Sequence, residues 1–201
     1  MRTADTIYQD LLPDLPGVPE PMVERALIRC AQELCRRARV WPVWTDPVTI
    51  KNGVTEYDME LPSGAQVIVI ERATRNGAPM AMTPWTFIQA PPQQAHGARI
   101  VPGRISFQTN GLVDGDEVCF RAVLAPADNA PGVPDEVFDP YSDLLAAGIK
   151  SRLMLTPGQP FTNLELGAAN AQAWSAGVSA ACLRAWRGHT DGTRRSRVMW
   201  C

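Results

Sequence analysis

Only a few residues of this chain carry side chains suited to catalysis, and they are scattered along it. The chain has two histidines, His96 and His189, and each lies in a glycine-bearing loop. A Ser/His/Asp or Cys/His site would need one of them held firmly against a nucleophile, which a mobile loop does poorly. A hydrolase that uses one of these histidines is therefore the least favoured of the alternatives.

The cysteines form no metal-ligand or redox pattern. Cys119 and Cys182 have no His or Cys at ligand spacing, and no Gly-rich phosphate-binding motif is present. Cys30 and Cys35 are expected on one helix but on different sides of it, which suits core packing better than nucleophilic chemistry. We expect no catalytic residue, no cofactor and no metal. Five cysteines without a pairing pattern indicate free thiols in a reducing compartment.

Four acids gather where a helix is expected to begin: Asp135, Glu136, Asp139 and Asp143. They could be read as a catalytic carboxylate cluster. The start of a helix explains them better, because negative charge there is stabilised by the helix dipole.

Arginines gather at the C-terminus. From Arg184 onward there are five Arg and one Asp, which gives a charge of +4. Because the net charge of the chain is −2, residues 1–183 carry −6. The final residues add an apolar, aromatic tip of Val198, Met199 and Trp200. A solvated tail gains nothing from an exposed Trp, whereas a tail inserted into a partner gains an anchor. We therefore favour a docking arm, made of Arg194, Arg195, Arg197, Val198, Met199 and Trp200, over a plain tail. A third possibility is direct nucleic-acid binding through the arginines.

Hydrophobic periodicity predicts the elements that would carry these residues. Residues 21–40 have a helical apolar stripe, and the period changes to two over residues 46–125, where short strands alternate with turns. Two further helices are expected, one from Asp135 to Thr156 and one from Phe161 to about Arg187. No run of 18 apolar residues occurs, so we expect no membrane span, and the N-terminus does not have the pattern of a signal peptide.

The helix from Asp135 contains a small-residue patch, Ala146, Ala147 and Gly148, which would let another backbone come close. Pro157 and Gly158 then end it, because Pro cannot continue a helix and Gly permits a turn. We expect these five residues to serve helix or subunit packing.

Together these features predict an α+β fold with three main helices in an antiparallel bundle, an inserted small antiparallel β subdomain and an extended C-terminal arm. The expected parts are an N-terminal arm with the first long helix, the β subdomain, a helical hairpin and the docking arm: residues 1–45, 46–130, 131–188 and 189–201.

Several segments, in order, resemble one protein family. Residues 26–80, ALIRCAQELC through to RNGAPM, resemble the start of the head-to-tail adaptor (connector or gatekeeper) proteins of tailed bacteriophages. Residues 146–163, AAGIKSRLMLTPGQPFTN, resemble a second family segment, with Phe161 where Trp is commoner. The third segment is a helix ending at Arg184-Ala185 before a basic tail. The resemblance covers residues 20–197, and residues 81–115 depart from it most.

This resemblance implies a structural virion protein at the head-tail interface, assembled in the host cytoplasm. Such adaptors form a dodecameric homo-oligomer ring under the portal protein, close the packaged head and offer the attachment site for a tail nozzle or hub protein. Double-stranded DNA passes through the central channel. The resemblance implies no enzymatic activity, cofactor or membrane partner, and it gives the C-terminal arm the role of docking to the portal.

Overall fold

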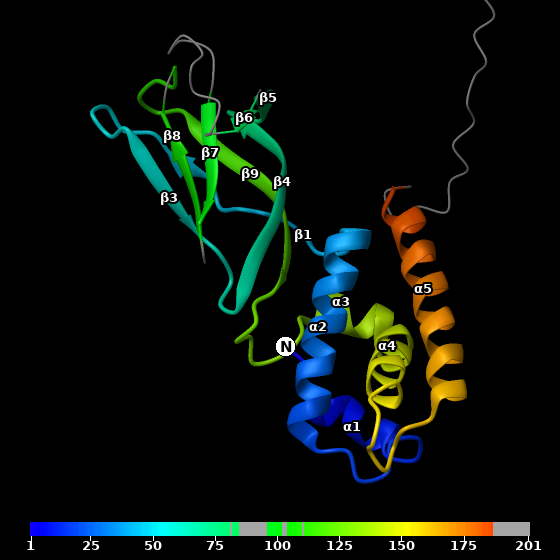
Figure 1. Ribbon diagram of the computed structural model, residues 1–201. Helices are drawn as coiled ribbons and strands as arrows, with labels where there is room; N and C mark the ends of the chain where they lie inside the picture. Colours follow the sequence, from blue (N-terminus) through cyan, green and yellow to red (C-terminus); the bar gives the residue numbers. More distant parts are fainter. Residues whose placement is uncertain (81, 85–95, 102–103, 110, 187–201) are drawn as a thin grey trace, which may run out of the picture.

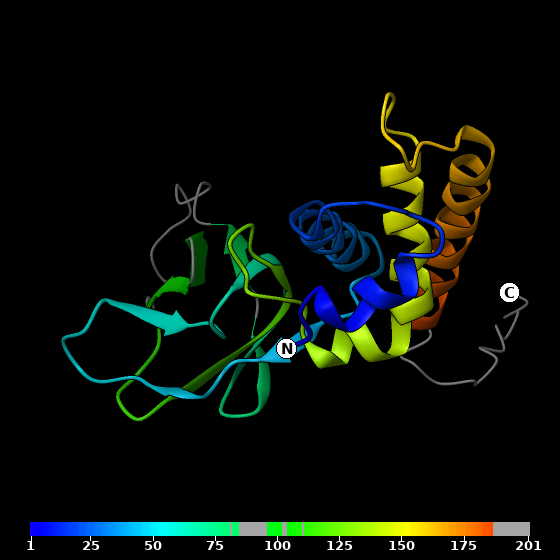
Figure 2. The same ribbon diagram turned by 90° about the horizontal axis from the view of Figure 1, so that it is seen from below.

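The computed structural model describes residues 1–80, 82–84, 96–101, 104–109 and 111–186 (Figure 1). Helices gather in one unit and strands in another, and the two units lie side by side in both views (Figure 1 and Figure 2). The helical unit contains α1 (Asp5–Leu11), α2 (Glu20–Ala38), α3 (Asp135–Phe138), a 3-10 turn (Asp139–Tyr141), α4 (Ser142–Met154) and α5 (Leu164–Trp186). The β unit lies between α2 and α3 in the chain.

Nine strands, counted over the described residues, build two sheets in the β unit. The first has the order β1-β9-β4-β5, with β2 also paired to β9; its members are β1 (Pro42–Trp44), β2 (Val48–Thr49), β4 (Ala65–Arg75), β5 (Ala78–Met80) and β9 (Glu117–Pro126). The second has the order β3-β8-β7-β6; its members are β3 (Glu56–Glu60), β6 (Met82–Pro84), β7 (His96–Val101) and β8 (Arg104–Gln108). All pairings are antiparallel except β6 with β7, which is parallel.

Aromatic rings join the two sheets. Phe107 of β8 meets Phe120 of β9 edge to face, with ring centroids 5.1 Å apart, and both side chains are buried. Tyr57 of β3 stacks on Phe107 at 5.7 Å. Aromatic pairs of this kind add to the free energy gained by burying apolar area. They hold the second sheet over the first.

Polar contacts fix the helical unit to the first sheet. The buried Gln32 of α2 donates from Nε2 to the Pro126 carbonyl oxygen at 3.1 Å and to Asp128 Oδ1 at 2.8 Å. The Leu124 amide donates to the Trp41 carbonyl oxygen at 2.9 Å. These bonds place the end of β9 against α2, so the two units share one continuous core.

The expectation of three main helices in a bundle with a small inserted β subdomain is wrong. The described chain is of the mixed α+β class, with four helices of seven residues or more and two full sheets. The additional helix is α1 (Asp5–Leu11), in the segment that the prediction assigned to the N-terminal arm and did not count among the main helices. Its apolar residues, with those of the following proline-rich loop, are buried in the common core: Ile7, Leu11, Leu15 and Val18. The β unit is larger than its short apolar segments indicate, because strands far apart in the sequence pair with one another and build two sheets.

The expected helix from Asp135 to Thr156 is also interrupted. It divides into α3, the 3-10 turn and α4, and the break lies at Pro140. Proline has no backbone N–H and its ring clashes with the preceding helical turn, so a regular helix does not run through this position.

Candidate assembly site

The small-residue patch of α4 lies in the seam between three helices. Gly148 is buried, and a Cβ atom built there would lie 2.7 Å from Trp174 Cε3 of α5 and 3.0 Å from Cys30 Sγ of α2. Real Cβ atoms do not come this close to other heavy atoms, so only glycine fits without movement. Ala146 and Ala147 are half-buried beside it. The patch is therefore the point where α4, α5 and α2 approach one another within one chain.

Pro157 and Gly158 lie away from this patch, at the exposed reversal between α4 and α5. Gly158 has φ of +76°, a left-handed conformation that suits glycine. The turn is closed by Thr162, whose Oγ1 donates to the Thr156 carbonyl oxygen at 2.5 Å and accepts from the Gln159 amide at 3.0 Å. The structure thus places the five predicted packing residues in two sets at different levels of the same helical hairpin.

The helix after this turn begins at a side-chain cap. Asn163 Oδ1 accepts from the Leu166 amide at 3.0 Å, in the manner of an N-cap residue. The Asn163 amide in turn donates to the Met154 carbonyl oxygen at 3.1 Å. The angle at which α5 leaves the turn is therefore set by bonds to both helices.

The docking-arm residues Arg194, Arg195, Arg197, Val198, Met199 and Trp200 lie outside the described residues, as does His189. The place where the arm begins is described. Residue 186 ends α5 next to the end of α2, where Cys182 Sγ donates to the Arg37 carbonyl oxygen at 3.1 Å. The last described residue therefore lies beside the C-terminal end of α2.

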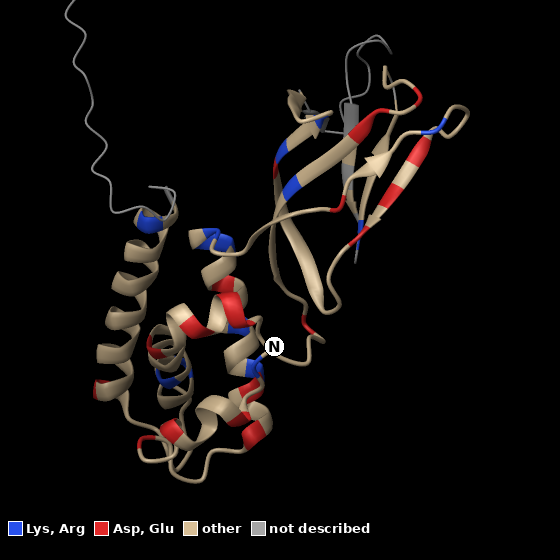
Figure 3. Ribbon diagram, turned by 180° about the vertical axis from the view of Figure 1, so that it is seen from behind, with Lys and Arg blue, Asp and Glu red and all other residues tan. Residues whose placement is uncertain are grey.

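Charge is divided between the two ends of the helical unit (Figure 3). We call the end that carries Arg36, Arg37, Arg39 and Arg184 the basic end. Within it, Arg37 pairs with Glu33 at 3.1 Å and Arg39 with Glu71 at 3.3 Å. The opposite, acidic end carries Asp5, Asp10, Asp14, Glu20, Glu24 and Glu165. There a hydrogen bond with the Asp5 carboxyl and the charge of that group raise the pKa of Glu20.

The thiols Cys30 and Cys35 are buried in α2. Burial raises the pKa of each thiol to about 12, so both are neutral at pH 7. Cys30 packs at the Gly148 seam. In the described part of the chain, no three His, Cys, Asp or Glu side chains are grouped to hold a metal ion. Over the same residues, no helix is long and apolar enough to cross a membrane.

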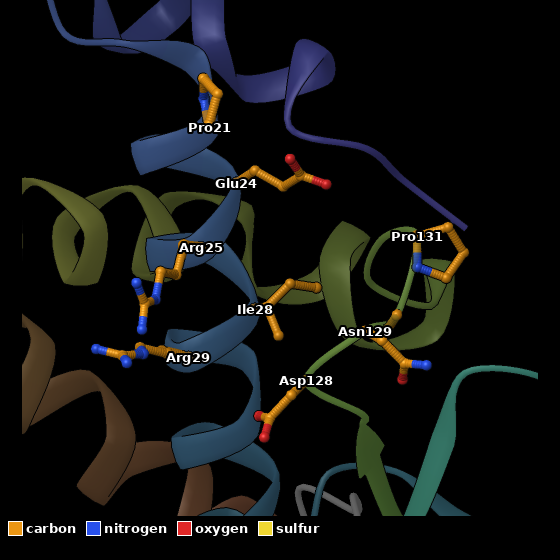
Figure 4. Close-up of a pocket in the computed structure, with 9 residues that line it drawn as sticks. Pro21, Glu24, Arg25, Ile28, Arg29, Asp128, Asn129 and Pro131 are labelled. Carbon is orange, nitrogen blue, oxygen red and sulfur yellow. The ribbon is translucent and has the colours of Figure 1, made fainter.

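Sequence reasoning missed a groove of about 640 Å³ between α2 and the loop 128–131. Figure 4 shows Arg25 and Arg29 pointing to the same side of α2, one helical turn apart, while Asp128 and Asn129 project from the loop. The groove has both signs of charge on its walls. No local sequence pattern predicts this groove, because its two walls come from segments far apart in the sequence.

Neither a comparison with protein-family models nor one with curated proteins found a match for this chain.

Proposed function

We propose that the chain is a structural head-to-tail adaptor of a tailed bacteriophage. In this proposal its copies form a ring under the portal protein, close the packaged head and provide the attachment site for a tail nozzle or hub protein. Double-stranded DNA passes through the channel of the ring. The protein acts by shape and docking, as part of the virion at the head-tail interface, and it is assembled in the host cytoplasm.

The observation that carries the proposal is the order of the resembling segments along the chain, residues 26–80 followed by residues 146–163. The second segment corresponds to most of α4, the exposed turn and the N-cap of α5. Close packing at Gly148 and the hydrogen bonds of Thr162 make the α4–α5 hairpin rigid. A rigid hairpin fixes the position of the residue from which the arm begins. This supports a role in assembly, where rigid subunits present a terminal segment to a partner.

The distribution of charge supports an arm that docks. The arm follows α5, which ends at the basic end, and its sequence has three more arginines, Arg194, Arg195 and Arg197, before its apolar tip. Long-range attraction by the arginines would bring an acidic portal surface close, and burial of Trp200 would then hold the arm in place. The net negative charge of residues 1–183 is suited to a ring around DNA, because a negatively charged surface does not bind the phosphates.

The decisive experiment is removal of residues 188–201, measured as binding to the portal ring by sedimentation or electron microscopy. We expect the truncated chain to keep its fold, seen as an unchanged melting temperature, and to lose portal binding. A matched control with residues 188–201 replaced by an uncharged Gly/Ser segment of the same length separates loss of chemistry from loss of length. Portal binding at full affinity by either variant would overturn the docking role.

A DNA-binding or tail-associated module is the second candidate, favoured by the charge of +4 from Arg184 to the end. Phosphate contacts give an affinity that falls steeply with salt, with a slope of about −0.9 per phosphate neutralised on a logarithmic scale. Binding to double-stranded DNA with such a slope, abolished by the truncation, would favour this candidate. Absence of binding at low salt would remove it.

A further inference from the structure

The outward face of α5 differs from every other helix surface in the described chain. Between Glu165 and Arg184 it has no charged residue, and Figure 3 shows the helix uncoloured between a red end and a blue end. Its exposed positions are small or uncharged: Ala168, Ala169, Gln172, Ala173, Ser175, Ala176, Ser179 and Ala180. Leucines are exposed near both ends, with Leu164 64%, Leu166 39% and Leu183 57% accessible.

The other helices expose charge. On α2 the exposed side chains include Glu24, Arg25 and Arg29, and on α1 they include Asp5 and Asp10. α4 exposes only Asp143 and Arg152, one of each sign. A partner surface that packs on an uncharged face should itself be uncharged. A charged side chain of the partner would lose its hydration there without gaining an ion pair, which costs free energy. Within the described residues, α5 is the one helix that offers such a face.

We propose that α5 packs antiparallel against α5 of a second copy of this chain, forming a two-fold dimer. The ends of the face are self-complementary in that arrangement, since Glu165 of one copy lies at the level of Arg184 of the other, at both ends of the contact. A parallel arrangement would instead place like charges together. The small residues between the ends allow the two helix axes to approach closely.

The dimer is weak by its size. A helix of 23 residues is about 34 Å long, so two helices bury roughly 700 Å² in total, against about 1,200 Å² or more for a stable interface. The association is therefore concentration-dependent and easily exchanged for a larger contact. A two-fold contact closes at two copies and does not build a ring. The inference thus stands independently of the proposed function.

Sedimentation velocity from about 10 µM to about 1 mM, a range suited to weak association, tests the dimer. We expect the unmodified chain to move from monomer to dimer across this range. Ala176→Glu, which puts a charge near the middle of the face, weakens the dimer by more than about tenfold. Gln9→Glu adds the same charge to the exposed face of α1 and leaves the dimer unchanged. Should Ala176→Glu alter the melting temperature, Ser179→Glu on the same face replaces it.

A mixing experiment tests the antiparallel order at low ionic strength. Glu165→Arg alone and Arg184→Glu alone each place like charges together at both ends, which weakens self-association by about fivefold. An equimolar mixture of the two variants restores opposite charges at both ends and returns the affinity to that of the unmodified chain. Helix-dipole effects within each variant cannot produce this recovery.

Three outcomes overturn the proposal. They are a monomer at every concentration, association that Ala176→Glu leaves intact, and a mixture that binds no better than its components. Portal binding is measured separately, so loss of the dimer and loss of the adaptor function are distinguishable.

Discussion

Gly148 lies on α4 between Trp174 of α5 and Cys30 of α2, and its lack of a side chain sets the spacing of the three helices. The run of small residues at positions 146–148 indicated a close approach from the sequence alone. Which side chains would fill the space could not be predicted, because Trp174 and Cys30 belong to other helices. Their positions follow from tertiary packing, which has no local pattern.

We expect Gly148→Ala to lower the free energy of unfolding by up to about 2 kcal/mol. Overpacking of a core costs about 1–3 kcal/mol, which exceeds the roughly 1 kcal/mol that alanine gains over glycine in a helix. Urea unfolding followed by circular dichroism measures the change. In a Trp174→Leu background the added methyl group has room, so the cost of Gly148→Ala should shrink there. Equal costs in both backgrounds would contradict the steric explanation.

Asp116 ties a turn of the β unit to a distant strand. Its carboxylate accepts from the Val113 amide at 2.7 Å, pairs with Arg75 at 2.8 Å and accepts from Asn76 Nδ2 at 2.8 Å. The Val113 hydrogen bond, followed by the contacts with Arg75 and Asn76, lowers the pKa of Asp116 against the opposing effect of burial. The turn was predictable from its Asp-Gly-Asp sequence, but these partners across the fold were not.

This shift predicts a pH-dependent contribution to stability. Because the folded-state pKa is lowered, the ionised carboxylate stabilises the fold above its unfolded pKa of about 3.9, and the contribution is lost as pH falls through the folded pKa. We expect Asp116→Asn to lower the melting temperature at pH 7, and the difference from the unmodified chain to narrow below about pH 4. Asp46→Asn, which removes a carboxylate at an exposed position of the same unit, serves as the control. A difference that stays constant from pH 7 to pH 3 would show that charge is not involved.

At the scale of elements, α2 was predictable from its helical apolar stripe, and β4 from the consecutive β-branched residues at positions 67–70. The helix was expected over residues 21–40 and spans Glu20–Ala38. The strand spans Ala65–Arg75, within the residues 46–125 where strands were expected. The sheet orders were not predictable, since β4 pairs with β9 although β5, β6, β7 and β8 lie between them in the chain, and the register shifts twice within that pairing. Hydrophobic periodicity indicates which face of a helix or strand is buried, but it does not indicate which other elements pack against that face.

Gln32 connects α2 to the end of β9 through its side-chain hydrogen bonds. Replacing it by Leu leaves the Asp128 carboxylate and the Pro126 carbonyl without this donor, although Pro126 keeps a bond from Gln66 Nε2 at 2.8 Å. We expect Gln32→Leu to destabilise the chain by about 1–3 kcal/mol, the cost of unsatisfied buried polar groups. Gln9→Leu, on the exposed face of α1, should cost far less. Chemical denaturation of both variants makes the comparison, and equal costs would mean that the Gln32 bonds contribute little.

At the scale of the whole molecule, the separation of charge was visible in the sequence only at the C-terminus. The acidic end became apparent with the fold, because it gathers the starts of α1, α2 and α5 from separate parts of the chain. The helix dipole favours acids at those starts and, in α2 and α5, arginines in the last turn. The fold thus combines these local preferences into a molecule with two electrostatically distinct ends.

The arm itself combines two kinds of side chain that should act at different stages of docking. Under the adaptor proposal, Arg194, Arg195 and Arg197 attract the portal from a distance, whereas Trp200 holds the arm after contact. Replacing the three arginines by Gln should slow association and flatten its salt dependence, with little change in dissociation. Trp200→Ala should leave association nearly unchanged and speed dissociation by at least about tenfold, as loss of a buried anchor does.

Surface plasmon resonance with immobilised portal rings separates the two rates across a range of salt concentrations. Thr193→Ala, within the arm but without charge or aromatic surface, is the matched control and should change neither rate. If Trp200→Ala slowed association alone, the tip would be part of the first encounter and would not serve as the anchor. If the arginine variant dissociated faster at all salt concentrations, the arginines would make buried contacts with the portal, and the division of the arm into steering and anchoring residues would be wrong.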